Sequence, residues 1–291
     1  MYKSSAIKKF CHKLLGLLPD KLFIQMKFFK NFHRFPNLKD PKTFNEKLQW
    51  LKLFNRNPYY TKLVDKYEVK KIVAELIGEE YIIPTLGVWD SADNIDFDKL
   101  PDRFVLKATH DSGRVIVCKN KKELDKEWAR KEMAKSLKRD FYALTREWPY
   151  KDVPRRIIAE EFIEDPSGDL KDYKFFCFNG VAEFFKVDFD RFTDHKANYY
   201  NKNWNLLPFE EIVCPANNRV KHEAPENFDK MIEFAEVLSK GLPFARIDFY
   251  NNNGKIYFGE VTFFPNSGMG RFNPAKTDIQ LGEMIKLPPK K

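Results

Sequence analysis

The most constraining feature of the sequence is a pair of aromatic-rich runs, 172–178 and 181–188, separated only by Asn179 and Gly180. Asn-Gly supplies the positive φ angles of a two-residue turn, so the runs predict an antiparallel hairpin. The runs at 245–250 and 255–264 flank a turn rich in Asn and predict a second hairpin. Further strands are expected at 81–88 (interrupted at Pro84), as a pair within 103–118, and at 156–163.

Helical periodicity dominates an earlier part of the chain, residues 43–77. Thr43 and Glu46 stand at the spacing of a capping box, and Asn57-Pro58 predicts a break between two helices. Helices are also expected at 121–139 and 226–241, whereas 189–222 has no clear periodicity and is expected to be irregular. Helices followed by antiparallel hairpins favour the α+β class.

The composition indicates a folded protein with two lobes, since the chain has 291 residues, of which 43% are hydrophobic and 28 are Phe. The chain contains no apolar run of about 18 residues and no signal-peptide pattern. A cytoplasmic location with reduced thiols is therefore expected. No zinc site is expected either, because the cysteines form no CxxC pair and the five His lie at no metal-ligand spacing from them; the cysteines are Cys11, Cys118, Cys177 and Cys214.

Positive charge is concentrated at the N-terminus. The formal net charge is +9, and residues 1–35 carry eight basic residues against one acidic residue. The remainder is nearly neutral, which argues against nucleic acid as a partner. Leu and Phe alternate with the lysines in this arm, as in segments that bind anionic membranes. A helix that packs on the body with solvated lysines fits the same pattern, and the sequence favours neither interpretation.

Lys107 is a candidate phosphate ligand. It ends an apolar strand, and the short polar loop that follows contains Asp111, Ser112 and Gly113. Phosphates are bound by ammonium groups together with backbone N–H groups, and this segment offers both. A lysine at the end of a strand is also commonly just solvated, so the motif is weak by itself.

Acidic residues on expected strands supply further candidates. Glu160 and Glu161 are adjacent, so they should point to opposite faces of a strand. An edge strand with one solvated Glu is the alternative. Asp248 and Glu260 lie on the two arms of the second hairpin, and converging carboxylates are typical of a Mg²⁺ site. Arg246 shares a face with Asp248 and could clamp a phosphate.

Lys174 lies between aromatic residues on an expected strand, so its ammonium group needs an acid or a phosphate as partner. The order of these segments, from the first lysine strand to the Arg-x-Asp and Glu-x-Thr strands, resembles the ATP-grasp superfamily. The resemblance is closer to the TupA-like ATP-grasp proteins, which are associated with teichuronopeptide and other bacterial cell-surface polysaccharide synthesis. It covers residues 40–288 and is carried by TFNEKLQWLKL, LVDKYEVKKIV, FVLKATHDSG, EEFI, DYKFFCFNG and FGEVTFFPNSG.

The resemblance implies roles for individual residues. Lys107 and Lys174 would contact phosphates, and Arg246 and Lys174 would act in catalysis. Mg²⁺ would bind Asp248, Glu260 and Thr262, although many relatives have Asn in place of Thr262, and Asn266 is an alternative ligand. ATP would be bound by Lys107, Asp111, Ser112, Gly113, Lys174 and the adenine hinge Glu160, Glu161, Phe162 and Ile163. Asp65-Lys66 resembles a pair found at the start of many ATP-grasp regions, or is simply part of a helix surface.

The resemblance also implies an overall organisation and an activity. We expect an α+β, ATP-grasp-like fold with two sheet-containing lobes that clasp ATP. A helical region, 1–80, would precede an ATP-grasp region, 81–291, with a phosphate-loop lobe at 100–162 and a metal-binding lobe at 163–291. The expected activity is an ATP- and Mg²⁺-dependent carboxylate–amine ligase acting on a surface polysaccharide, such as a capsule, or on its precursor. The alternatives are a glycosyltransferase, a sugar kinase, or a non-catalytic ATP-binding protein at the inner face of the membrane.

Overall fold

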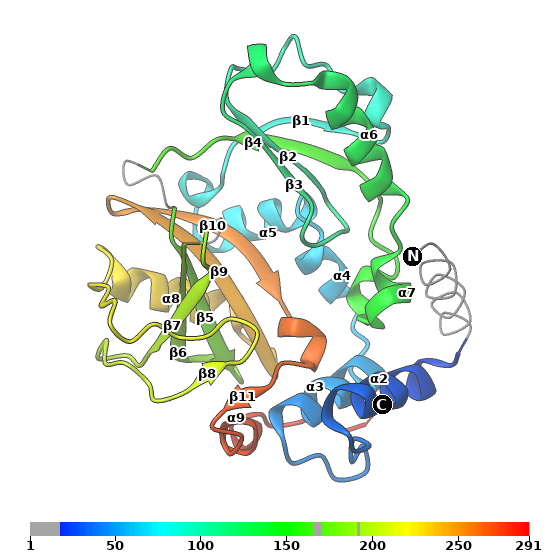
Figure 1. Ribbon diagram of the computed structural model, residues 1–291, viewed down its shortest axis with the longest axis vertical. Helices are drawn as coiled ribbons and strands as arrows, with labels where there is room; N and C mark the ends of the chain where they lie inside the picture. Colours follow the sequence, from blue (N-terminus) through cyan, green and yellow to red (C-terminus); the bar gives the residue numbers. More distant parts are fainter. Residues whose placement is uncertain (1–17, 166–169, 191–192, 291) are drawn as a thin grey trace.

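A computed structural model describes residues 18–165, 170–190 and 193–290, and Figure 1 shows how their helices and strands are arranged. A four-stranded sheet lies at one end of the molecule, and a five-stranded sheet lies below it (Figure 1). The helices are α2 (Asp20–Phe32), α3 (Phe44–Phe54), α4 (Tyr59–Val64), α5 (Glu68–Ile77), α6 (Lys126–Leu137), α7 (Phe141–Thr145), α8 (Phe228–Ser239) and α9 (Thr277–Met284). The strands are β1 (Thr85–Trp89), β2 (Phe104–Ala108), β3 (Val115–Cys118), β4 (Ile157–Glu161), β5 (Asp172–Phe178), β6 (Val181–Phe189), β7 (Lys196–Tyr200), β8 (Glu210–Glu211), β9 (Phe244–Asn252), β10 (Lys255–Thr262) and β11 (Phe272–Asn273).

The four-stranded sheet has the order β1-β4-β2-β3, with each pair antiparallel. It has a hydrophobic core of its own, in which Leu106 and Ala159 pack with Ala129 and Met133 of α6. The strands predicted at 81–88, 103–118 and 156–163 are therefore confirmed. Because β4 pairs with strands on both sides, the alternative interpretation of 156–163 as an edge strand is wrong.

The five-stranded sheet has the order β10-β9-β5-β6-β7 and contains both predicted hairpins. Asn179 and Gly180 adopt positive φ angles of 52° and 85°, as the turn between β5 and β6 requires. One face of this sheet packs on α8 and is apolar, with Phe175, Ile247 and Phe249 fully buried. Alternate residues of the same strands point to the opposite face, which carries charged groups.

Residues 189–222 are not wholly irregular, contrary to the prediction. The segment contains β7, which pairs with β6, and the two-residue strand β8, which pairs with β11. Tyr199 and Tyr200 on β7 are buried, but they are adjacent and so do not produce the alternating pattern of a half-buried strand. Pairing with β6 stabilises this segment more than its own sequence does.

Residues 43–77 form three helices, α3 to α5, and the predicted capping box of Thr43 and Glu46 is present. The ring of Phe44 lies edge-on to Phe244 of the five-stranded sheet, with centroids 5.0 Å apart. Phe44, Leu48 and Val73 belong to the same hydrophobic cluster as that sheet. The helices thus share a core with the five-stranded sheet. The domain boundaries at residues 80, 100 and 163 stay predictions.

The basic N-terminal arm is described from residue 18 onward, so the part of the membrane prediction that concerns residues 1–17 lies outside the described residues. Helix α2 buries Phe23, Ile24 and Phe28 against the body, as the packed-helix interpretation requires. It also exposes Leu22, Met26 and Phe29 at helical spacing, each by 44–46%.

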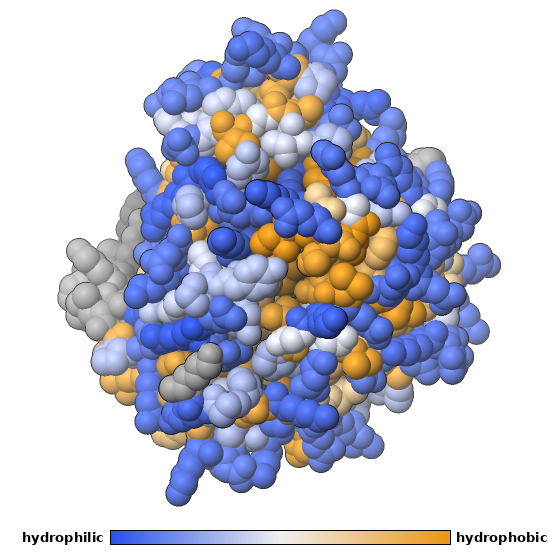
Figure 2. Space-filling model, turned by 180° about the vertical axis from the view of Figure 1, so that it is seen from behind, coloured by the Kyte–Doolittle hydropathy of each residue, from blue (hydrophilic) through white to orange (hydrophobic). Residues whose placement is uncertain are grey.

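Exposed apolar surface is not confined to α2. Seen from behind, apolar side chains gather in the middle of the molecule, in the region of α5 and α8 (Figure 2). Leu76 of α5 and Val237 of α8 are among the exposed hydrophobic residues. Exposure alone therefore does not single out α2 as a membrane-binding element. Among the residues that the structure describes, no helix is both long and apolar enough to cross a membrane.

Candidate active site

Glu160 lies at the centre of the first group of charges, on β4. It is 3% exposed and forms two ion pairs. Its carboxylate oxygens lie 2.5 Å from Nζ of Lys107 on β2 and 2.7 Å from Nζ of Lys70 on α5. Burial alone would raise the pKa of Glu160, but the two lysines outweigh it and hold the pKa below its ordinary value. Glu161 is exposed on the other face, so the two neighbouring acids diverge as expected from strand geometry.

The loop after β2 is held by Asp111, which is buried. Its Oδ1 accepts hydrogen bonds from the backbone N–H of Ser112 and from Arg139, both at 2.8 Å. Gly113 has a φ of 86°, and no atom lies within 4 Å of the position of an added Cβ. Asp111 therefore organises the loop, and Gly113 leaves open space beside it. The role of the loop in phosphate binding stays a prediction.

Lys174 of β5 lies on the charged face of the five-stranded sheet among three aspartates. Its Nζ contacts Asp172, Asp188 at 3.0 Å and Asp248 at 3.4 Å. Burial alone would lower the pKa of Lys174, but the three carboxylates raise it above its ordinary value. Lys174 is therefore a fixed cation at neutral pH, as the sequence requires of a residue that must find an acid or a phosphate.

Arg246 and Asp248 of β9 form a bidentate pair, with N–O distances of 2.7 and 2.6 Å. The same guanidinium lies 3.4 Å from Glu260 and 3.1 Å from the hydroxyl of Thr262, both on β10. Glu260 lies opposite Asp248 in the strand register, after an irregularity at Gly259. The four residues that the sequence assigned to charge neutralisation and metal binding are therefore brought together.

The two carboxylates differ in their electrostatic environment. Burial raises the pKa of Asp248 to about 6, against the opposing effect of Arg246 and Lys174. Burial acts in the same direction on Glu260, but Lys66, Arg246 and Lys174 outweigh it and lower the pKa to about 2. Asp248, Glu260 and Thr262 offer only oxygen atoms as metal ligands, and Mg²⁺ prefers oxygen ligands. The three residues therefore fit Mg²⁺, which would share both carboxylates with Arg246.

Lys66 connects the two halves of the site. Its Nζ donates to the carbonyl oxygen of Asp111 at 2.9 Å and lies 3.7 Å from Glu260. Asp111 belongs to the loop of the four-stranded sheet, whereas Glu260 belongs to the five-stranded sheet. The charged groups of both sheets therefore meet at Lys66. The Asp65-Lys66 pair in the sequence was a signal for this residue, although a weak one.

Sequence analysis missed several members of the charged cluster. Lys186 of β6 contacts Glu211 at 2.9 Å and Asp188 at 3.4 Å, and Glu211 also accepts a hydrogen bond from Asn266 at 2.9 Å. Alternation along β6 could have indicated Lys186 and Asp188, since they share a face. Glu211 could not be found in this way, because a two-residue strand has no period.

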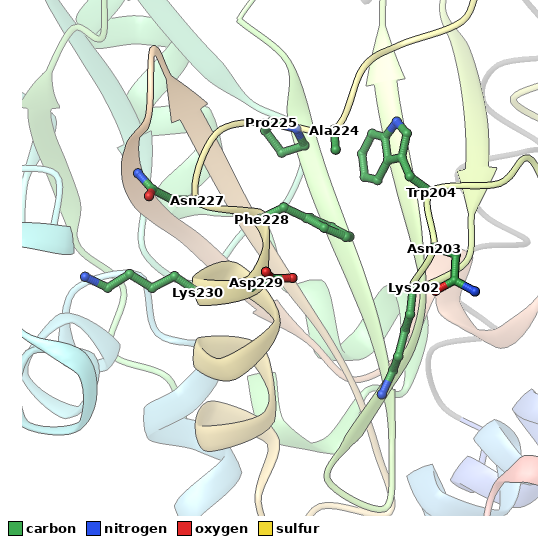
Figure 3. Close-up of a pocket in the computed structure, with 9 residues that line it drawn as sticks. All are labelled: Lys202, Asn203, Trp204, Ala224, Pro225, Asn227, Phe228, Asp229 and Lys230. Atoms are coloured by element: carbon green, nitrogen blue, oxygen red, sulfur yellow. The ribbon is translucent and has the colours of Figure 1, made fainter.

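Two surface hollows lie away from these charged residues. Figure 3 shows a hollow of about 710 Å³ at the start of α8, where Trp204 and Phe228 line one part and Asp229 and Lys230 another. A second hollow, of about 810 Å³, is lined by residues of 39–50 and 279–287. Neither is lined by the charged residues described above. The candidate active site is defined by its converging charges.

The chain is similar to proteins of one described family. The family profile of TupA-like ATP-grasp proteins matches residues 46–286. Similar solved structures include an ADP complex of N5-carboxyaminoimidazole ribonucleotide synthetase, with 16% identity and a TM-score of 0.41. The match covers 75% of this chain and 50% of the synthetase. The ATP complex of D-alanine–D-alanine ligase from Bacillus anthracis is 17% identical with a TM-score of 0.41, and 77% of this chain matches 63% of it. This chain thus spans about half to two thirds of these proteins. No curated protein sequence matches it.

Proposed function

Because the chain belongs to the TupA-like ATP-grasp family, we propose that it is an ATP-dependent ligase that joins a carboxylate to an amine through an acyl phosphate. The observation that carries this proposal is the convergence of Lys66, Lys174, Arg246, Asp248 and Glu260 where the two sheets meet. Buried cations of fixed position suit the transfer of a phosphoryl group, which depends on preorganised charge.

The first step is phosphoryl transfer. An oxygen of the substrate carboxylate attacks the γ-phosphorus of ATP, the bond to the β–γ bridging oxygen breaks, and ADP leaves. Lys174 and Arg246 stabilise the charge on the transferred group. Lys107 and the loop at Asp111, Ser112 and Gly113 hold the phosphates. Lys107 is paired with Glu160 in the structure, and its ammonium group would turn in part from Glu160 to a phosphate when ATP binds. Asp248, Glu260 and Thr262 would hold Mg²⁺, which would supply further neutralisation of the triphosphate.

The second step forms the amide. The amine attacks the acyl carbon, the bond to the phosphate oxygen breaks, phosphate leaves, and the nitrogen loses a proton to water or to the departing phosphate. Glu161 ends β4, and Phe162 and Ile163 follow it in the chain. In this proposal the segment would contact adenine. Phe162 lies under the guanidinium of Arg103, 5.8 Å from its ring centroid, so one of its faces is already used.

The substrate we propose is an acidic sugar, such as a uronic acid, in a bacterial surface polysaccharide or its precursor, with an amino compound as the second substrate. The family resemblance supports this choice. The basic arm supports a location at the inner face of the membrane, where lipid-carried precursors are found.

The test is ADP release by the full chain with Mg²⁺, measured over a matrix of uronic acids and amines, with mass spectrometry of the product. We expect ADP formation that requires one acid and one amine, with an amide formed in equal amount. Asp248→Asn and Glu260→Gln should each lower the rate by about 100-fold or more. Asp98→Asn, an exposed acid paired with Lys126 on the other lobe, is the control. Turnover of a sugar nucleotide without ADP release would instead identify a glycosyltransferase, and ATP binding without turnover a non-catalytic protein.

A further inference from the structure

Three residues of different chemical kinds meet at the side of the five-stranded sheet. Asp188 lies near the end of β6, His195 directly precedes β7, and Cys214 follows β8. Their carboxylate, imidazole and thiol ligand atoms all lie within 4.8 Å of one another. Nε2 of His195 is 3.3 Å from Oδ1 of Asp188, and Sγ of Cys214 is 3.9 Å from the carbonyl oxygen of His195.

We propose that Asp188, His195 and Cys214 form a zinc site. A thiolate, an imidazole and a carboxylate are the three ligand types that Zn²⁺ takes in proteins, and the thiolate disfavours Mg²⁺ and Ca²⁺. Zinc–ligand bonds of about 2.0 to 2.3 Å place tetrahedral ligands about 3.5 Å apart. The three atoms, all within 4.8 Å of one another, therefore already lie near the spacing that such a site needs.

The burial and hydrogen bonding of the Asp188 carboxylate also favour a bound cation. Its side chain is 2% exposed, and its Oδ1 accepts no hydrogen bond among the described residues. Lys174 lies 3.0 Å from the other oxygen, Oδ2. Asp188 can therefore offer Oδ1 to a metal and keep Oδ2 on Lys174. His195 Nε2 at 3.3 Å and Lys186 Nζ at 3.4 Å approach this oxygen, and a metal–ligand bond would be shorter than either contact.

The neighbouring lysines do not exclude a second cation. Lys186 approaches Oδ1 at 3.4 Å, but it has Glu211 as a closer partner at 2.9 Å. Lys174 likewise contacts Asp172 and Asp248. Burial raises the pKa of the Cys214 thiol to about 11, so the thiol is neutral until a metal displaces its proton. The thiolate charge then offsets part of the charge of Zn²⁺.

One coordination position of this site is open. The side chain of His195 is 41% exposed, whereas Asp188 and Cys214 are buried. Three protein ligands with one open position are typical of zinc sites that bind water or a substrate. The site is distinct from the Mg²⁺ ligands, Asp248 and Glu260, and does not depend on the proposed ligase activity. Asp188 connects it to Lys174, so bound zinc would change the surroundings of that lysine.

Zinc binding to the full chain tests the proposal. The protein is stripped with a chelator, dialysed, and titrated with Zn²⁺ in competition with a chromophoric chelator, and bound metal is counted by mass spectrometry. We expect one zinc per chain, and a visible spectrum with a thiolate charge-transfer band when Co²⁺ replaces it. Cys214→Ala and His195→Ala should each weaken zinc binding by about 100-fold or more, beyond the range of residues that only orient ligands.

Cys118→Ala, a buried thiol in the other lobe, and His33→Ala, an exposed imidazole, are the matched controls. They should bind zinc like the unaltered protein. His195 is on the surface, so its variant keeps the test valid if Cys214→Ala does not fold, as judged by circular dichroism. Absence of stoichiometric zinc in the unaltered protein, or equal losses in the control variants, would overturn the proposal. ADP release needs no zinc in this account, so the two proposals fail independently.

Discussion

At the scale of single residues, Lys52 of α3 is a buried cation outside the active site. It bonds to the turn that follows β10, the strand of Glu260. It is 1% exposed, and burial lowers its pKa to about 8. Its Nζ donates to the carbonyl and the hydroxyl of Ser267 at 2.8 and 2.7 Å. The Ser267 hydroxyl in turn bonds to the buried carboxylate of Glu147. Asn266 and Ser267 have φ angles of 47° and 56°, so Lys52 stabilises a strained turn directly after β10.

Lys52→Met should lower the free energy of unfolding by about 3 kcal/mol, because it removes the buried ammonium group whose charge acts most strongly on the buried Glu147. Urea denaturation measures this change. In the double variant Lys52→Met/Glu147→Leu most of the loss should be recovered, since neither charge is then buried alone. A single variant that costs less than about 1 kcal/mol, the usual value of a surface pair, would show that the fold does not depend on the interaction of Lys52 with Glu147.

Residue types and strand alternation were enough to predict that Arg246, Asp248 and Glu260 converge. The partners of Lys174 were missed, although strand alternation puts Asp172 on the same face of β5 as Lys174 and puts Asp188 with Lys186 on one face of β6. The trio of Asp188, His195 and Cys214 could not be predicted from the sequence. Its members are 7 and 19 residues apart along the chain, and only the pairing of β6, β7 and β8 brings them together.

At the scale of elements, the hairpin of β9 and β10 positions the proposed metal ligands. The register is irregular between Phe258 and Glu260, and this places Glu260 opposite Asp248. A Cβ added at Gly259 would lie 3.0 Å from the backbone oxygen of Asp248. A side chain at position 259 would therefore displace β9, the strand that carries Asp248. Gly259 therefore allows the close approach of the two strands at the site.

Gly259→Ala should reduce Mg²⁺-dependent ADP release by about tenfold, because a shift of a few tenths of an ångström misplaces Asp248 relative to Glu260. Tyr257→Phe, two residues earlier on the same strand, is the control and should keep full activity. Steady-state kinetics and the melting temperature are measured together. A variant with unchanged ADP release would show that the irregularity does not position the site.

Elements with a strong local signal were predicted, and those that depend on distant partners were not. The Asn-Gly turn and the capping box of α3 are local, and both are present. By contrast, β8 has two residues and pairs with β11, about 60 residues away, so nothing in its own sequence indicates a strand. Helix α9 was also missed. It has eight residues and packs against α3, which supplies the contacts that a short helix needs.

At the scale of the whole molecule, α2 has two apolar faces with different roles. Phe23, Ile24 and Phe28 are buried in the body, whereas Leu22, Met26 and Phe29 are exposed beside Lys21 and Lys30. We propose that α2 would lie on an anionic membrane with these exposed apolar side chains inserted and its lysines near the head groups.

The variant Leu22→Gln/Met26→Gln/Phe29→Gln should co-sediment with anionic vesicles about tenfold less than the unaltered chain, since it loses the inserted side chains and keeps the buried face. Binding of the unaltered chain should weaken with salt, because each lysine near the surface contributes about 1 kcal/mol. Leu76→Gln on α5 is the control. If all three proteins sediment alike, α2 is structural and the membrane proposal is wrong.

The central claim is that the two sheets bind the phosphates of ATP with Lys107 and Lys174. Calorimetric titration of the full chain with Mg-ATP and with AMP tests it most directly. Lys107→Ala and Lys174→Ala should each weaken ATP binding by about tenfold or more, as expected for loss of a charged hydrogen bond, and leave AMP binding nearly unchanged. Lys99→Ala, an exposed lysine of the same lobe as Lys107, should bind both nucleotides normally. Equal losses for ATP and AMP in the two variants would assign these lysines a structural role, and no ATP binding by the unaltered chain would contradict the account.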